Sequence, residues 1–230
     1  MKIFATNDNA GSAFAMTPPL LKLKSEGVEV IAFAENRAPA FKVFEKAGFR
    51  VHSPALSPDV QDMIVILERA RPSLVFVGVS DISGTEKLAL RAAHKLGIRT
   101  VAIVESWPHK WLQNFGQRDV PLYRNCNAVL VVDEIAKKKM VEAGFAAEGV
   151  VITGNPANDD LPALQKELPH YRKMMREKLG FSDDDFIFVY LVTNDLDDPE
   201  AELTEWLGFK EVSALKEFLA AVRDARLPGV

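Results

Sequence analysis

One unit repeats through the first 150 residues: a short apolar segment, a polar loop, an amphipathic stretch and a glycine just before the next apolar segment. A helix that ends in this way places a cation near the negative end of its dipole and a glycine in the left-handed conformation. The pattern recurs at Gly27, Gly48, Gly97 and Gly144, and once more at Gly180. Helix, glycine and strand in regular succession are typical of βαβ units, so we predict a mostly parallel sheet with helices on both faces.

The strands of this sheet are expected at apolar segments rich in β-branched residues. The segments are almost continuously apolar, which suits strands buried on both faces better than alternating edge strands. They are Lys2–Ala5, Glu29–Phe33, Leu74–Gly78, Thr100–Val104 and Ala128–Val132. The predicted fold class is α/β, with a Rossmann-like doubly wound parallel sheet.

The regular alternation ends at a break in the chain. A further strand expected at Val150–Thr153 stops at Gly154, Asn155 and Pro156, and an acidic, helix-opening run follows. Glycine allows a positive φ, and Pro156 biases Asn155 toward extended geometry. We interpret this break as the crossing between two α/β domains. The predicted division is a domain over residues 1–155, a linker helix over 156–180 and the start of a second domain over 181–230.

The last segment is predicted to hold a single strand and a single helix, over Phe186–Val192 and Val212–Ala225. An isolated strand has no neighbour to pair with. Two interpretations are open: the strand joins the first sheet, or the sequence is part of a longer protein in which the second domain continues. We favour the second interpretation.

Composition narrows the classes of function. The 230 residues carry a net charge of −4, which argues against a general nucleic-acid binder with a basic face. The one cysteine, Cys126, rules out an intramolecular disulfide and fits a reducing compartment. The N-terminus turns polar too early for a signal peptide, and no apolar run approaches the roughly 20 residues of a membrane span. We therefore expect a cytoplasmic protein without a membrane span.

Metal and hydrolase motifs lack support in this sequence. The histidines outside the loop discussed below are scattered and show no metal-ligand spacing: His52, His94 and His170. No Gly-x-Ser-x-Gly elbow of a Ser-His-Asp hydrolase occurs either. We expect no metal site.

Ligands of open parallel sheets bind beyond the carboxyl ends of the strands, so the loops there hold the candidate site residues. The loop after the first strand contains Asn9, Gly11 and Ser12 and opens a helix, whose early amides favour anions. It has neither the dinucleotide fingerprint nor the lysine of a P-loop. The loop could equally be an Asx turn with a helix cap.

The loop after Leu74–Gly78 contains Ser80 and Asp81, followed by Ser83 and Glu86. The last two have the spacing of a capping box, so we expect them to serve the start of the next helix. Asp81 is not needed for that cap. It is therefore a candidate for a functional carboxylate.

The loop after Thr100–Val104 is dense in aromatic residues. Glu105 at the strand end is followed by Trp107, His109 and Trp111. Aromatic faces with interspersed polar groups suit sugar rings or bases, and His109 could act as an acid or base near neutral pH. Alternatively, the tryptophans pack at the domain edge and His109 is solvated.

These loops together resemble the N-terminal domain and linker of GT-B-type glycosyltransferases and their relative, UDP-N-acetylglucosamine 2-epimerase. The resemblance rests on the polar Gly-Ser loop, Val79-Ser80-Asp81, Val104 to Trp107 and Thr153 to Pro156. The helix and strand that follow, Arg176 to Gly180 and Phe186 onward, add to it. In the epimerase branch, an Asp and a Glu at these two strand ends belong to the active site. The resemblance thus implies catalytic roles for Asp81 and Glu105, with a sugar nucleotide as substrate and no other cofactor.

Two functions follow as hypotheses. The first is the acceptor-side domain of a GT-B-like glycosyltransferase or sugar-nucleotide-processing enzyme. Its catalytic candidates are Asp81, Glu105 and His109; its binding candidates are Asn9, Gly11, Ser12, Ser80, Trp107, Trp111, Gly154 and Asn155. The second is a stand-alone Rossmann-like domain that binds a ligand or partner without catalysis, with its tail completing the sheet or pairing with a second copy in a homodimer. Fold alone does not decide between them.

Overall fold

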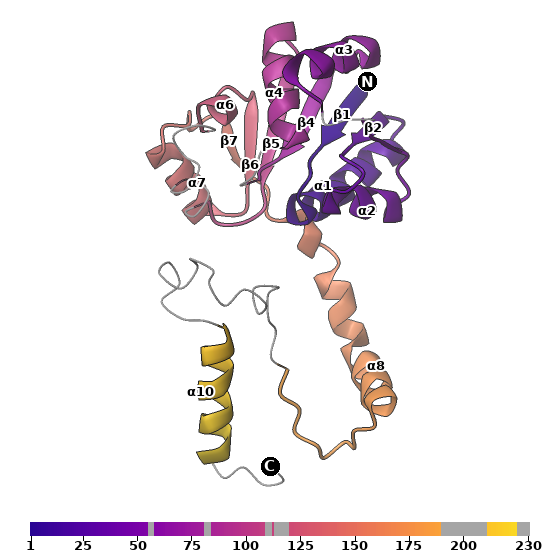
Figure 1. Ribbon diagram of the computed structural model, residues 1–230, viewed down its shortest axis with the longest axis vertical. Coiled ribbons are helices and arrows are strands. Elements are labelled where there is room, and N and C mark those ends of the chain that lie inside the picture. The colour runs from indigo at the N-terminus through magenta and orange to yellow at the C-terminus, as the bar shows by residue number, and fades with distance from the viewer. Residues whose placement is uncertain (55–57, 81–83, 109–111, 113–119, 190–210, 225–230) are drawn as a thin grey trace. The chain divides into compact units, whose positions relative to one another are not determined.

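The computed structural model describes residues 1–54, 58–80, 84–108, 112, 120–189 and 211–224. The chain divides into two compact units, Met1–Ala163 and Leu164–Val230 (Figure 1). The first unit contains the strands and the candidate site.

The first unit is built on a parallel sheet in which seven strands have the order β3-β2-β1-β4-β5-β6-β7, counted over the described residues. The strands are β1 (Lys2–Thr6), β2 (Glu29–Phe33), β3 (Val51–His52), β4 (Leu74–Gly78), β5 (Arg99–Val104), β6 (Ala128–Val131) and β7 (Val150–Ile152). The chain builds outward from β1 to β3, then returns to place β4 beside β1, where Phe4 pairs with Val75. The sheet is therefore doubly wound, as predicted, and its topological switch point lies between β1 and β4.

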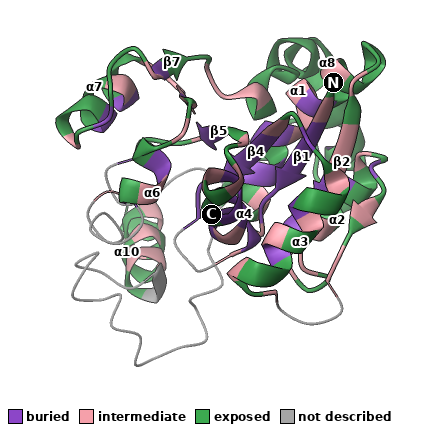
Figure 2. Cartoon of the chain, turned by 90° about the horizontal axis from the view of Figure 1, so that it is seen from above, coloured by how far each residue is buried: buried purple, intermediate pink, exposed green. Residues whose placement is uncertain are grey.

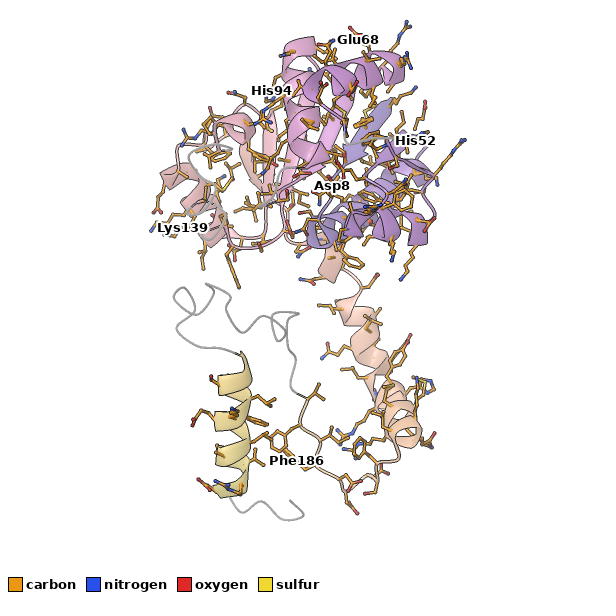
Figure 3. All side chains as sticks on the ribbon, in the orientation of Figure 1. Asp8, His52, Glu68, His94, Lys139 and Phe186 are labelled. Atoms are coloured by element: carbon orange, nitrogen blue, oxygen red, sulfur yellow. The ribbon has the colours of Figure 1, made fainter. Side chains whose placement is uncertain are left out.

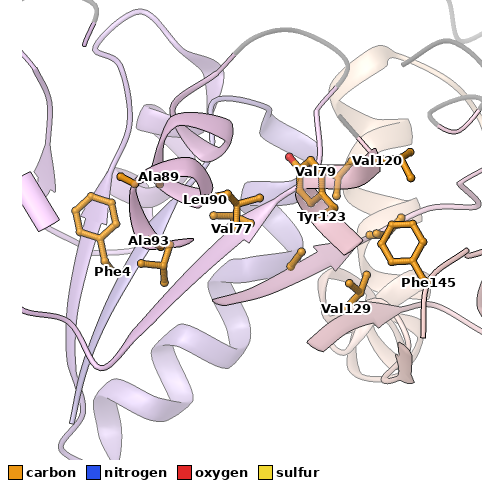
Figure 4. Close-up of a cluster of buried hydrophobic side chains, with 14 of the residues drawn as sticks. Phe4, Val77, Val79, Ala89, Leu90, Ala93, Val120, Tyr123, Val129 and Phe145 are labelled. Atoms are coloured by element: carbon orange, nitrogen blue, oxygen red, sulfur yellow. The ribbon is translucent and has the colours of Figure 1, made fainter. Parts of the chain in front are cut away.

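Helices cover both faces of this sheet. They are α1 (Ala10–Ser25), α2 (Pro39–Lys46), α3 (Val60–Ala70), α4 (Thr85–Leu96), α6 (Val120–Arg124) and α7 (Glu134–Glu142). Alternate residues of β1 explain the two faces: Ile3 and Ala5 belong to the core formed with α1 and α2, whereas Phe4 belongs to the core formed with α3, α4, α6 and α7. Figure 4 shows the second core, and Figure 2 shows the buried residues gathered on the central strands.

The glycines expected to end helices take the left-handed conformation. All have φ between +65° and +87°: Gly27, Gly48, Gly97, Gly144 and Gly180. Gly154, at the predicted crossing, also has a positive φ of 78°. L residues other than glycine rarely adopt this backbone conformation, so each of these glycines marks where a helix or strand ends.

The chain leaves β7 through a 3-10 turn (η1, Pro156–Asn158) and continues into α8 (Leu161–Leu179), which crosses the boundary between the units. In the second unit, the guanidinium of the buried Arg176 donates to the Ser182 carbonyl and, at 2.9 Å, to the Asp185 carbonyl. These bonds hold the segment after α8, which includes the Phe186 labelled in Figure 3, against the end of that helix.

Residues Phe186–Val189 form no strand, although a strand was predicted to begin there; residues 190–192 of that prediction lie outside the described ranges. The segment instead packs through rings, with Phe188 5.3 Å from Phe218 of α10 (Glu211–Asp224), measured between ring centroids. A strand needs a neighbour to satisfy its backbone, and the described part of this unit contains none. None of the helices in the described ranges has the length and apolar character that crossing a membrane requires.

Gly78 should tolerate no side chain. A Cβ built there lies 2.3 Å from Ser12 Cβ and 2.8 Å from Asn7 Cγ, so we expect Gly78→Ala to lower the free energy of unfolding by about 1–3 kcal/mol. Urea unfolding followed by circular dichroism measures this change. Gly149→Ala is the matched control because its Cβ meets nothing closer than 3.4 Å, and it should change stability by less than about 0.5 kcal/mol. Equal stabilities of the two variants would contradict the close packing at Gly78.

Candidate functional site

The polar candidates meet at the carboxyl edge of the sheet, around the switch point. Asn9 follows β1, Ser80 follows β4 and Glu105 follows β5. Parallel strands end at the same edge of a sheet, so side chains far apart in sequence become neighbours there. This edge is the location that the sequence predicted for ligand contacts.

A hydrogen bond between Ser12 and Glu105 joins the first turn of α1 to the end of β5. The Ser12 hydroxyl is buried and lies 2.9 Å from both Glu105 Oε2 and the Val79 carbonyl oxygen, each of which can accept its proton. Gly11 permits this approach, since a Cβ there would lie 3.1 Å from Glu105 Oε1. The Glu105 carboxylate therefore sits against the N-terminal turn of a 16-residue helix, where the dipole favours negative charge.

Asn9 is the N-cap of α1. Its Oδ1 accepts a hydrogen bond from the Gly11 amide at 2.7 Å, so the cap that the sequence allowed is formed. Beside it lies a small pocket of about 110 Å³. The residues that line this pocket are Asn9, Val79, Ser80, Val104, Glu105, Ser106 and Pro108.

Asn155 connects the crossing after β7 to the same edge. Its Nδ2 donates to the Glu105 carbonyl oxygen at 3.0 Å, and its Oδ1 accepts from the Ala157 amide at 3.0 Å. The positive φ of Gly154 turns the chain just before this contact. Asn155 thus fixes the backbone, rather than the carboxylate, of Glu105.

Trp107 lies on the surface next to α7. Its indole Nε1 donates to Asp133 Oδ2 at 2.8 Å, while 59% of the residue remains exposed. Asp133 in turn caps α7 by accepting from the Ala136 amide at 2.7 Å. The ring is therefore oriented by a hydrogen bond and accessible to a ligand. Three other predicted site residues, Asp81, His109 and Trp111, lie outside the described ranges.

Asp8 is a structural member of the site that sequence reasoning did not select. Its carboxylate accepts from the Thr85 amide at 2.7 Å and from the Glu35 amide at 3.1 Å. One side chain thereby joins the loop after β1 to the start of α4 and to the loop after β2 (Figure 3 shows Asp8 within this unit). Its position after a strand was visible in the sequence, but both amide donors are distant in sequence.

Glu86 does not close the predicted capping box. The N-cap of α4 is Gly84, which makes no side-chain cap, and Ser83, the other member of the predicted box, lies outside the described ranges. Glu86 is instead fully buried, and its Oε1 accepts a hydrogen bond from the Ser80 hydroxyl. Its Oε2 is buried with no hydrogen-bond partner in the described part of the chain, directly over Gly84, where a Cβ would lie 2.4 Å away.

Burial raises the pKa of Glu86 to about 7, because the charged carboxylate loses its water there. The hydrogen bond from Ser80 opposes this rise, and the nearby charge of Asp8 adds to it. The site thus contains a carboxyl group that is half protonated near neutral pH. Across the described ranges, no group of three or more His, Cys, Asp or Glu side chains could hold a metal ion.

Comparison with solved structures identifies proteins of the same fold. They include UDP-GlcNAc 2-epimerases and a protein in complex with UDP-glucose, and they confirm the α/β fold that the sequence predicted. A UDP-GlcNAc 2-epimerase from Neisseria meningitidis, bound to UDP-GlcNAc, matches over 80% of this chain with a TM-score of 0.56 and 20% identity. The UDP-GlcNAc 2-epimerase of Methanocaldococcus jannaschii also matches over 80%, with a TM-score of 0.53 and 17% identity. HepE from Anabaena, in complex with UDP-glucose, matches over 78%, with a TM-score of 0.55 and 15% identity.

The similarity covers about half of each of these three structures. The chain spans 53% of the Neisseria protein, 54% of the Methanocaldococcus protein and 50% of HepE. No protein-family model matches the sequence, and no curated protein matches it significantly. At these identities the comparison establishes the fold.

The buried Glu86 should make stability fall as pH rises. Between pH 4.5 and about 7, the unfolded chain releases this proton while the folded chain retains it. The free energy of unfolding should therefore drop across this window by up to about 3 kcal/mol, and Glu86→Gln should remove that drop. Urea unfolding at a series of pH values measures both slopes.

Glu68→Gln serves as the control, because it removes one carboxylate from the exposed surface of α3 and reports the effect of net charge alone (Figure 3). A Glu86→Gln variant with the same pH slope as the unsubstituted protein would show that Glu86 is not the titrating group.

Proposed function

We propose that this chain is the acceptor-side part of a GT-B-like protein that processes a sugar nucleotide at the carboxyl edge of the β1-β4-β5 strands. The observation that carries the proposal is the Ser12–Glu105 hydrogen bond of 2.9 Å, beside a pocket, at the switch point of this fold. The similar proteins solved with UDP-GlcNAc and UDP-glucose support a UDP-sugar as the ligand. The acceptor and a homodimer remain predictions from the sequence.

Glu105 is the base in this proposal. A base that activates a hydroxyl must lie within about 3 Å of it and be ionised at the working pH. Ser12 donates one hydrogen bond to Oε2, and the dipole of α1 supports the negative charge. The second oxygen, Oε1, lies beside Gly11, where a Cβ would stand 3.1 Å from it. Asp81 and His109 remain alternative acid–base groups.

The exposed ring of Trp107 is the proposed stacking surface for the sugar. Its hydrogen bond to Asp133 fixes the indole edge, so a ligand that packs on the face would not have to order the side chain. Trp111 is the second stacking candidate. Both tryptophans should report ligand binding through their fluorescence.

A second function, binding without catalysis, is favoured by the size of the pocket. Its volume of about 110 Å³ is well below the roughly 300–1,000 Å³ of a typical small-molecule site. A sugar ring would fit only partly into this volume. Such a pocket could form one side of a larger cleft, or it could belong to a domain that binds a small chemical group of a partner molecule. Catalytic turnover distinguishes the two.

The decisive experiment titrates the protein with UDP-GlcNAc, UDP-glucose and UDP by isothermal calorimetry and assays release of UDP. We expect saturable binding of a UDP-sugar. Glu105→Gln should weaken it by about ten- to a hundredfold, the cost of losing a hydrogen bond to a charged group, and should abolish turnover.

Glu68→Gln is the matched control, since it makes the same chemical change on the exposed face of α3. Binding and turnover that are unaffected by Glu105→Gln would refute the role of Glu105. Binding with no turnover in the unsubstituted protein would favour the non-catalytic function. The absence of binding to all three ligands would refute the sugar-nucleotide proposal.

A further inference from the structure

Glu86 touches the candidate pocket only through another residue. Ser80 lines the pocket and donates its hydroxyl proton to Glu86 Oε1, whereas Glu86 itself is fully buried behind it. Glu86 Oε2 has no hydrogen-bond partner within the described ranges. The proposed reaction assigns no role to this carboxyl group, and burying a carboxyl oxygen without a hydrogen-bond partner is costly.

Charged groups from the neighbouring elements act on Glu86 with opposite signs. Asp8, in the loop after β1, disfavours the ionised carboxylate, and Lys87, the next residue of α4, favours it. Asp8 is held in place by the Thr85 amide at 2.7 Å, so its charge has a fixed position at the start of α4. Desolvation is the largest influence and, like Asp8, it favours the protonated acid. Glu86 can therefore change its charge near neutral pH without leaving the core.

We propose that Glu86 is a positioning residue whose protonation decides whether the Ser80 hydroxyl donates or accepts a hydrogen bond in the pocket. This inference rests on the proposed function for the identity of the ligand. The coupling between Glu86 and Ser80 is a property of the protein without ligand.

The hydrogen-bond donors and acceptors of the two groups explain how protonation of Glu86 changes the role of the Ser80 hydroxyl. An ionised carboxylate only accepts, so it retains the single proton of the Ser80 hydroxyl, and Ser80 offers the pocket lone pairs alone. A protonated Glu86 can donate to Ser80 Oγ instead. The Ser80 hydroxyl then no longer gives its proton to Glu86 and can turn it toward the pocket. The proton that makes this change comes from solvent and stays on Glu86, and no other bond is altered.

A bound UDP-sugar should select the protonated form. Its oxygens are hydrogen-bond acceptors, so they favour the state in which the Ser80 hydroxyl turns its proton toward the pocket. Ser80 then donates to an oxygen of the ligand. Binding should thus take up a proton near pH 7, and affinity should fall by up to about tenfold per pH unit above it.

The first arm of the test needs no ligand. Carbon-13 NMR of serine Cβ follows Ser80 from pH 5 to pH 9, with Ser80→Ala used to assign the signal. We expect the Ser80 signal to titrate with a midpoint near 7, and to become flat in Glu86→Gln but not in Glu68→Gln. A Ser80 signal that is flat in the unsubstituted protein would overturn the proposal.

The second arm measures UDP-GlcNAc affinity by calorimetry at pH 6, 7, 8 and 9. Glu86→Gln and Ser80→Ala should both abolish the fall in affinity above pH 7. Ser80→Ala should nevertheless keep the pH dependence of unfolding that Glu86 causes, which separates positioning from a purely structural role. An unchanged pH profile of affinity in both variants would overturn the proposal. Ser80 titration in the first arm, with no binding at any pH, would instead refute the proposed ligand and leave the coupling intact.

Should Glu86→Gln fail to fold, Ser80→Ala alone decides the second arm. It removes a hydroxyl at the pocket wall, together with its hydrogen bond to Glu86, and keeps the buried carboxyl group itself. Retention of the full pH profile of affinity in Ser80→Ala would then overturn the proposal.

Discussion

The close contact between the end of β4 and the first turn of α1 organises the whole site. Gly78 has no side chain, so Ser12 and Asn7 pack directly against its backbone. This contact places the Ser12 hydroxyl within reach of both the Val79 carbonyl and the Glu105 carboxylate. A side chain at position 78 would separate these elements, and the loops after β1, β4 and β5 would no longer converge. The missing Cβ at Gly78 thus permits the close approach on which the contacts of Ser12 depend.

Hydrogen bonds between residues of different elements offset the cost of burying polar groups at this edge. Thr6 and Thr85 share a hydroxyl hydrogen bond of 2.7 Å, and Asp8 accepts from two backbone amides. Such bonds are worth more when one partner is charged and solvent is excluded. Two oxygens in this region, Asn7 Oδ1 and Glu86 Oε2, nevertheless have no hydrogen-bond partner in the described part of the chain. A buried polar group without a hydrogen-bond partner lowers the stability of the fold. Its position next to a pocket therefore points to a functional reason for it.

The fold could be predicted from the sequence because its signals are local. A glycine after a helix and an apolar segment after the glycine involve only neighbouring residues, and the strands and left-handed glycines confirm that reasoning. The same local reasoning misassigned Glu86, because the spacing from Ser83 is that of a cap, whereas its contact with Ser80 depends on how β4 meets α4. Asp8 was missed for a related reason: its amide partners at Thr85 and Glu35 are brought to it only by the order of the strands. The predicted strand at Phe186 had the right composition but no neighbouring strand in the described part of its unit.

The two carboxyl groups of the site differ because their surroundings differ. Glu105 lies at a pocket wall, receives a hydrogen bond from Ser12 and faces the positive end of α1, all of which stabilise a carboxylate. Glu86 lies behind Ser80 without access to water and near Asp8, and its pKa is raised to about 7 as a result. Acid–base sites commonly separate two carboxyl groups in this way, so that one is ionised while the other holds a proton. In this chain the difference follows from burial, from the neighbouring charge of Asp8 and from the hydrogen bonds that each carboxyl group receives: Glu86 is enclosed behind Ser80, whereas Glu105 lines the pocket.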